Sequence, residues 1–275
     1  SSTALNAGPS FSAVLDVMRN EICTYQPGSS GKYTESPAGA LSERVQQMHR
    51  TLIEYVAESD DSLLEKFFAK GLLAEEELRA GLHHAMQNQV FVPLFAVSAA
   101  TNVGVARLMD FIAKYGSSPL DRAEVSAKDL SGLPGHVALS QPDPVAYIFK
   151  TMNEPGVGEL SLFRVFSGTI RSGDELRNTV RHLNERLGQI YLLNGHERKP
   201  VDALKAGDLG AVVKLKDTHT GDTLCTTRFQ VVLPPVDYPA PNIHAALKLR
   251  SKGDEDKLAV GLATLHLEDP TFHYR

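Results

Sequence analysis

The sequence contains no tryptophan, only two cysteines and no apolar run approaching the roughly 20 residues that cross a membrane. Cys23 and Cys225 lie far apart in the chain, so they predict neither a metal site nor a disulfide framework. We therefore expect two unreactive thiols in a reducing, cytoplasmic protein that has no membrane partner. Its 275 residues are long for one domain and natural for two or three.

Signatures of catalysis are equally scarce. Among ten histidines there is no H-E-x-x-H pair and no cluster with cysteine, and no G-x-S-x-G turn presents a nucleophilic serine. His83 and His84 are adjacent, so they point in different directions from one helix, unlike a chelating i, i+4 pair. We therefore assign no catalytic residue and no metal site.

Residues 27–34, PGSSGKYT, are similar to a phosphate-binding loop but depart from it twice. That loop requires G-x-x-x-x-G-K-[ST], because its backbone N–H groups surround the phosphates and its hydroxyl binds Mg²⁺. Here Gln26 stands at the first glycine position, and Tyr33 follows Lys32 in place of Ser or Thr. The segment instead predicts an exposed hairpin tip. The guanine-selecting N-K-x-D motif occurs nowhere in the sequence.

Charge is unevenly distributed along the chain. The net charge is −5 overall, −4 within residues 1–119 and +1 within residues 143–235. An acidic protein does not bind nucleic acid by bulk charge, so any RNA contact needs a local basic face. Five arginines lie within a 23-residue stretch, and Arg164, Arg171 and Arg181 are the candidate RNA contacts. A solvated rim is the alternative interpretation of these arginines.

The first ninety residues predict a short strand region and then helices. Residues 11–25 indicate one strand or a strand pair, and 40–57 place apolar side chains three or four apart, as in an amphipathic helix. Ser59, Asp60 and Asp61 supply N-cap chemistry for a second helix that Gly71 can end. Residues 74–87 predict a third helix, which opens with three glutamates.

Residues 90–116 predict one strand–loop–helix unit. The run VFVPLFAV at 90–97 is continuously apolar, which predicts a buried strand. A polar loop follows at 98–104, and an amphipathic helix then ends near Gly116. We interpret this unit as the closing edge of a larger α/β domain.

The rest of the chain changes pattern twice. Residues 120–142 are rich in Ser, Pro, Gly and Asp and show no period, which predicts a linker. Short apolar segments separated by turn residues then predict a β-barrel up to about residue 233. Beyond Pro234 and Pro235 we expect one strand at 243–249 and one helix at 255–267.

Two barrel segments, FRVFSGTIRSGDEL (163–176) and LKAGDLGAVVKLKDTHTGDTL (204–224), resemble the second domain of translational GTPases, most closely elongation factor G. VPLFAVSAATNVGV (92–105) is similar to the last guanine motif of that family, and SKGDEDKLAVGLATLHLEDPTF (251–272) to the start of its third domain. The order and spacing agree over residues 8–275.

The resemblance implies a multidomain α/β and β fold. We expect an α+β inserted subdomain (1–91), the last αβ unit of a P-loop GTPase domain (92–119), a linker (120–142), a translation-factor β-barrel (143–235) and the opening of a ferredoxin-like third domain (236–275). In the family, a strand followed by Ser-Ala places backbone N–H groups beside the guanine base. The resemblance therefore implies that Ser98, Ala99 and Ala100 contact guanine.

The resemblance further implies a ribosomal GTPase that couples GTP hydrolysis to translocation. GTP or GDP and Mg²⁺ would bind the longer protein, whereas this chain alone is expected to bind no cofactor and to be inactive. Its implied partners are small-subunit ribosomal RNA, through the barrel, and the GTPase-associated region of the ribosome, through the insert. We expect a monomer.

Residues 178–196 depart from the family pattern, because they lack its Lys/Gly-rich turn and its Met-His-Ala-Asn run. An elongation factor G-like paralogue is therefore one interpretation. The alternatives are a related ribosomal GTPase of the ribosome-protection, release or recycling type, and a nucleotide-independent adaptor that binds RNA or protein.

Overall fold

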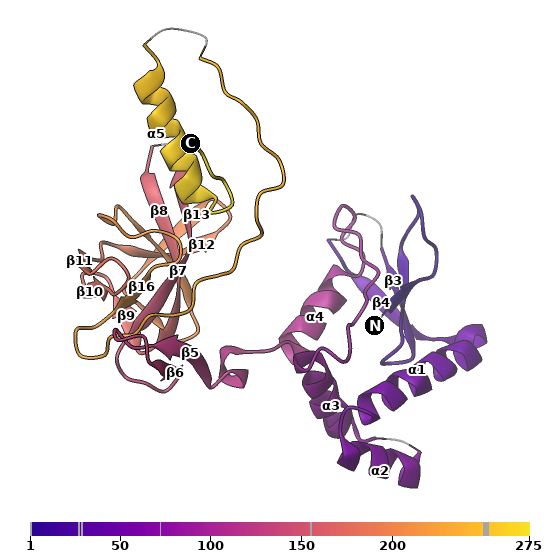
Figure 1. The fold of residues 1–275 in the computed structure, drawn as a ribbon. Coiled ribbons are helices and arrows are strands. Elements are labelled where there is room, and N and C mark those ends of the chain that lie inside the picture. Colours follow the sequence, from indigo (N-terminus) through magenta and orange to yellow (C-terminus); the bar gives the residue numbers. More distant parts are fainter. Residues whose placement is uncertain (1, 27, 29, 72, 155, 250–252) are drawn as a thin grey trace. The chain divides into compact units, whose positions relative to one another are not determined.

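The computed structural model describes residues 2–26, 28, 30–71, 73–154, 156–249 and 253–275 (Figure 1). These residues form two compact units, 1–117 and 118–275, each with its own core. None of the described helices combines the length and hydropathy that a membrane crossing requires.

The first unit combines an antiparallel sheet with helices. The sheet has the order β1-β2-β3-β4, and it is followed by a 3-10 turn and four helices (Figure 1). The elements are β1 (Ser2–Ala4), β2 (Ala13–Asp16), β3 (Glu21–Tyr25), β4 (Tyr33–Pro37), η1 (Gly39–Leu41), α1 (Ser42–Ala57), α2 (Asp61–Lys70), α3 (Glu75–Gln87) and α4 (Val105–Tyr115). Of the two possibilities left open for residues 11–25, one strand or a strand pair, the structure shows the pair β2 and β3, and all four predicted helices are confirmed.

Local chemistry fixes the ends of α2. Asp60 Oδ1 accepts hydrogen bonds from the backbone N–H groups of Ser62 and Leu63, at 2.8 and 3.2 Å. Gly71 ends the helix with φ of 69°, a left-handed conformation that glycine adopts without strain. The predicted cap and stop residues are both confirmed.

The apolar stripe of α1 faces the core of this unit. Val45, Leu52 and Val56 are buried, and Val56 packs with Leu82 of α3 and with two aromatic residues of α4. Burying a side chain of this size contributes about 1.5–3 kcal/mol, so helix packing rather than helix propensity stabilises α1.

Residues 90–97 differ from the buried strand predicted for them. The segment is extended, but among the described residues its one backbone link to the sheet is the Ser2 N–H, which donates to Leu94 O at 3.0 Å. Phe91 and Phe95 pack inward, whereas Val92 and Leu94 are 82% and 77% exposed. The apolar run was expected to be covered on both faces, but no described strand covers the second face.

The second unit is built on an antiparallel sheet of eight strands in the order β11-β10-β16-β7-β8-β15-β12-β13. These strands are β7 (Val145–Glu154), β8 (Gly158–Ser167), β10 (Glu175–Asn178), β11 (Leu183–Arg186), β12 (Ile190–Asn194), β13 (Glu197–Val201), β15 (Leu209–Val213) and β16 (Thr223–Cys225). Two further strands, β9 (Thr169–Arg171) and β14 (Ala203–Lys205), form a separate antiparallel pair. One cluster, which includes Phe163, Ile148 and Leu224, fills the interior. The predicted barrel strands are confirmed.

Residues 120–142, predicted to be a linker because they show no period, contain a pair of strands. After η2 (Pro119–Asp121), β5 (Glu124–Lys128) and β6 (Pro134–Ala138) form a hairpin. Lys128 and Val232 exchange backbone hydrogen bonds of 2.9 and 2.8 Å. Ala127 and Val137 pack against the sheet in a second cluster with Val145 and others, so the hairpin belongs to the barrel unit.

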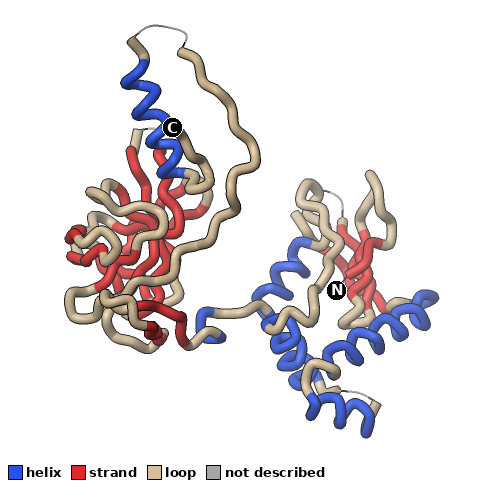
Figure 2. The backbone as a smooth tube through the Cα atoms, viewed as in Figure 1, coloured by secondary structure: helices blue, strands red, loops and turns tan. Residues whose placement is uncertain are grey.

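The last forty residues contain one helix among those described. α5 (Glu255–Glu268) confirms the predicted helix and lies beside β7, whose Asn153 N–H donates to the Glu268 carboxylate at 2.5 Å. The strand expected at 243–249 is absent from the described residues, which Figure 2 shows as loop up to the grey segment. Ile243 is 89% exposed. An alternating apolar pattern forms a strand only when a neighbouring strand accepts its hydrogen bonds.

Candidate functional site

The loop that follows residues 90–97 is a closed turn. Ser98 and Val103 exchange backbone hydrogen bonds, with the Ser98 N–H donating at 2.9 Å and the Val103 N–H at 3.1 Å. The Thr101 hydroxyl donates to Ser98 Oγ at 2.8 Å. Ala99 and Ala100 are exposed at its tip and carry only methyl groups. The tip of the turn is therefore free of large side chains, and Ser98 lies at its start.

Gly104 joins the loop to α4, and any other residue there would force neighbouring atoms to move. Gly104 has φ of 76°, and a Cβ atom there would stand 2.6 Å from the carbonyl oxygen of Ala96. Asn102 also has a positive φ, of 57°. Left-handed backbone is costly outside glycine, so packing around the loop must hold Asn102 in place.

The phosphate-loop look-alike is a hairpin turn, as the sequence predicts. Tyr25 pairs with Tyr33 across β3 and β4, and the residue after Lys32 begins a strand rather than a helix. Residues 27 and 29 of this turn lie outside the described residues. A phosphate cradle needs a helix N-terminus behind its glycines, and this turn leads into β4 instead. No group of three or more potential metal ligands occurs in the described part of the chain.

In the first turn of α4, Arg107 forms a buried ion cluster. Its side chain is 8% exposed, and its Nη2 lies 3.0 Å from Glu35, 3.4 Å from Asp16 and 3.6 Å from Glu21. Its guanidinium carbon also lies 5.4 Å from the centre of the Tyr33 ring. Burial opposes the charge, but Cys23, Asp16 and Tyr33 together raise the pKa of Arg107 above its usual value. Arg107 was not singled out from the sequence, although an arginine inside an apolar helix stripe is a usable signal.

Both thiols are free and buried. Burial raises the pKa of Cys225 to about 11 and also raises that of Cys23, an effect that Arg107 partly offsets. Neither sulfur is a ready nucleophile, because the thiolate is the reactive form.

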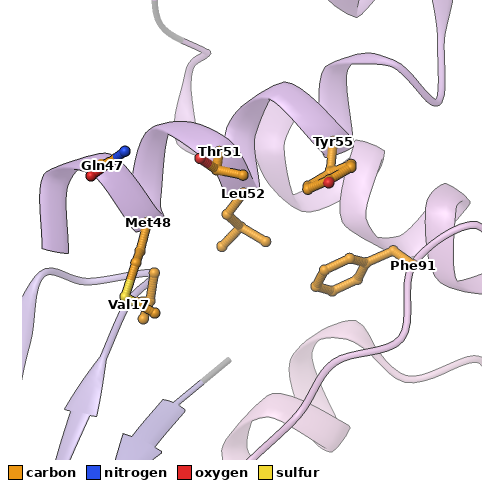
Figure 3. A pocket seen from close by; sticks show the side chains of 7 residues that line it. All are labelled: Val17, Gln47, Met48, Thr51, Leu52, Tyr55 and Phe91. Atoms are coloured by element: carbon orange, nitrogen blue, oxygen red, sulfur yellow. The ribbon is translucent and has the colours of Figure 1, made fainter. Parts of the chain in front are cut away.

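Two hollows open in the described part of the first unit. One, of about 380 Å³, lies between α1 and Phe91; Figure 3 shows Met48, Leu52 and Tyr55 extending from α1, with Val17 drawn next to Met48. Its lining is mainly apolar and carries no charged side chain. The other, of about 530 Å³, is lined by α3, α4 and the β2–β3 turn and holds charges of both signs around Arg107. Neither hollow includes Ser98, Ala99 or Ala100.

The barrel arginines lie on separate elements and differ in how firmly they are held. Arg164 of β8 stacks on Phe166 at 5.1 Å. Arg181 donates to Asp222 at 2.8 Å and to Asp217 at 3.0 Å. The Arg171 side chain is exposed at the end of β9 and makes no ion pair among the described residues. The three candidates therefore differ in their surroundings, and of these three Arg171 has the guanidinium that makes neither an ion pair nor a ring contact among the described residues.

A buried polar network shapes the loop 214–222 beside Arg181. Glu185 is 1% exposed, and its carboxylate accepts from Lys216 N–H at 3.0 Å, Asp217 N–H at 3.0 Å and the Thr218 hydroxyl at 2.8 Å. His219 in this loop lies 3.4 Å from Glu159, whose carboxylate raises the pKa of His219 while burial opposes the shift. Glu185 and Glu159 thus fix the conformation of this loop, and the sequence alone did not indicate these contacts.

The antiparallel barrel, with its turns of Gly-Asp and Ser-Gly, defines a β-rich module of the translation-factor type. Residues 143–227 match the family model "Elongation factor G domain 2". A crystal structure of a Thermus thermophilus protein matches with a TM-score of 0.79 and 25% identity over 98% of this chain. Residues 143–227 are therefore similar to the second domain of elongation factor G, and the chain shares its fold with the Thermus protein. It spans 38% of the length of the Thermus protein.

Proposed function

We propose that this chain is the central, ribosome-docking part of an elongation factor G-type GTPase that couples GTP hydrolysis to translocation. The observation that carries the proposal is the barrel at 143–227, which has its own buried core and matches the family's second domain. The barrel would bind small-subunit ribosomal RNA, with Arg171 as the principal phosphate contact and Arg164 and Arg181 beside it. The insert, residues 1–91, would meet the GTPase-associated region of the ribosome.

Nucleotide chemistry in this proposal needs residues outside the chain. Ser98, Ala99 and Ala100 would contact the guanine base through their accessible backbone. Phosphoryl transfer depends on a loop lysine and Mg²⁺ that position the γ-phosphate. Residues 27–34 depart from the phosphate-loop pattern, so the proposal assigns this lysine and the Mg²⁺ site to residues outside the chain. GTP or GDP and Mg²⁺ would therefore bind the longer protein, and the barrel and insert would act as docking modules.

The chain alone is expected to show no binding of GDP or GTP at micromolar concentrations and no GTP hydrolysis. Base contacts without phosphate contacts forgo the charge-assisted hydrogen bonds that supply most of the affinity for an anionic nucleotide. Isothermal titration calorimetry with GDP and Mg²⁺ measures this, with a GTPase that has an intact phosphate loop as the positive control. Micromolar GDP binding would contradict the proposal that nucleotide binding needs residues outside this chain.

A further inference from the structure

The tip of the β3–β4 hairpin lies directly against the candidate guanine loop. Gly31, with φ of 89°, lies so close to Asn102 that a Cβ atom on Gly31 would stand 2.7 Å from the amide nitrogen and 3.2 Å from Cγ of that side chain. Asn102 is the residue that holds left-handed backbone in the middle of the loop. The hairpin backbone therefore limits where the Asn102 side chain, and with it the loop, can move.

The same sheet also anchors the loop from below. Val103 is buried in a cluster with Val14, Cys23 and Tyr25, against which Tyr33 and others pack. Val103 is the residue whose backbone closes the turn with Ser98. Val103 is thus held twice, by apolar packing against the sheet and by its backbone hydrogen bonds to Ser98.

A third connection follows one turn later. Arg107 of α4 is surrounded by carboxylates from β2, from the start of β3 and from β4, at 3.0–3.6 Å. Residues 102, 103 and 107 are therefore each held by the sheet β2–β3–β4, whereas Ala99 and Ala100 nearby remain exposed. This arrangement fixes the C-terminal side of the loop and leaves its tip free for a ligand.

We propose that the sheet β2–β3–β4 positions the guanine-contacting loop, with Gly31 as the positioning residue at its tip. The inference rests on the proposed guanine role of Ser98, Ala99 and Ala100 and adds a role for the insert beyond ribosome contact. A loop that is ordered before its ligand arrives avoids the entropic cost of ordering on binding. A disturbance of the hairpin would therefore change the loop without touching any residue that contacts the base.

Two glycines of the hairpin turn provide a matched test. Gly28 and Gly31 both have positive φ, but a Cβ atom on Gly28 meets nothing within 4 Å. Gly31→Ala is expected to speed amide hydrogen exchange at Ser98 and Val103 about tenfold, because over-packing must displace Asn102. Gly28→Ala also places a side chain on backbone with positive φ, but it meets no neighbour and should leave both amides unchanged. NMR hydrogen exchange on the 275-residue chain measures both variants.

A rescue variant separates positioning from general damage. Asn102→Gly removes the side chain that Gly31 abuts, so adding Gly31→Ala in that background should cause no further change at Ser98 and Val103. The thermal midpoint of Gly31→Ala should equal that of Gly28→Ala. Equal exchange in the Gly31→Ala and Gly28→Ala variants, or an undiminished Gly31→Ala effect in the Asn102→Gly background, would overturn the inference. Because exchange is measured without nucleotide or ribosome, its outcome is independent of whether the proposed function holds.

Discussion

Glu185→Ala is expected to lower the free energy of unfolding of residues 118–275 by about 3 kcal/mol. The substitution removes a buried carboxylate that accepts three hydrogen bonds from Lys216, Asp217 and Thr218. Hydrogen bonds to charged groups contribute about 1.5–3 kcal/mol each, and donors left buried without an acceptor lose their solvation as well. The loop 214–222 should lose its fixed conformation together with this stability.

Two variants control this measurement. Glu185→Gln keeps the volume and one acceptor oxygen, so its loss should be smaller, about 1–2 kcal/mol. Glu175→Ala removes an exposed carboxylate from β10, where surface changes usually stay within about 0.5 kcal/mol. Urea unfolding followed through barrel amide NMR signals measures all three. Equal losses for Glu185→Ala and Glu175→Ala would show that the buried network does not stabilise the barrel.

Arg107→Met is expected to lower the free energy of unfolding of residues 1–117 by about 3 kcal/mol. Methionine fills much of the space, but it leaves the carboxylates of Asp16, Glu21 and Glu35 close together without their shared cation. Removing one partner of a buried ion cluster typically costs about 3–5 kcal/mol, and the partial exposure of the carboxylates places this cluster at the lower end.

Arg19→Met is the matched control for that variant. Arg19 also faces Glu35, at 4.0 Å, but its side chain is half exposed. Exposed pairs contribute about 0–1 kcal/mol, so this variant should be close to the unmodified chain in urea unfolding. If the two arginine variants lost similar free energies of unfolding, the buried ion cluster of Arg107 would contribute no more than an exposed ion pair. That result would contradict the stabilising role proposed for the cluster. The Ser98 and Val103 amides should also exchange faster in Arg107→Met than in Arg19→Met.

Features set by neighbouring residues could be predicted from the sequence. Asp60 and Gly71 mark the two ends of α2 because cap and stop chemistry acts within one turn. The barrel strands follow from alternation and turn residues, which are equally local. The hairpin at 27–34 could likewise be predicted, because Gln26 and Tyr33 depart from the phosphate-loop pattern.

Features set by distant partners could not be predicted in this way. The apolar runs at 90–97 and 243–249 have strand composition, but a strand also needs a hydrogen-bonding neighbour, which composition does not reveal. The hairpin β5–β6 was missed for the opposite reason. Its short strands contain Gly135 and Pro134 and gain their stability from Val232 and the barrel, which are distant in the sequence.

The candidate site shows the same division. Ser98, Ala99 and Ala100 could be proposed from a local pattern, and the structure places them on an exposed, closed turn. The contact between Gly31 and Asn102 and the ion pairs of Arg107 each join elements far apart in the sequence. The position of Arg107 in an apolar stripe marks the residue, but its carboxylate partners have no local signal. The ion pairs of Arg181 with Asp217 and Asp222 are also non-local, which is why the sequence could not separate Arg181 from Arg171.

Co-sedimentation of this chain with isolated small ribosomal subunits tests the proposed docking role most directly. Saturable binding that weakens as salt rises is expected, because phosphate contacts release counterions. Arg171→Gln should weaken it and lower the salt slope by about 1, whereas Lys257→Gln, which removes an exposed charge from α5, should not. Absence of the chain from the pellet at about 10 µM, or equal binding by the two variants, would contradict the proposed role.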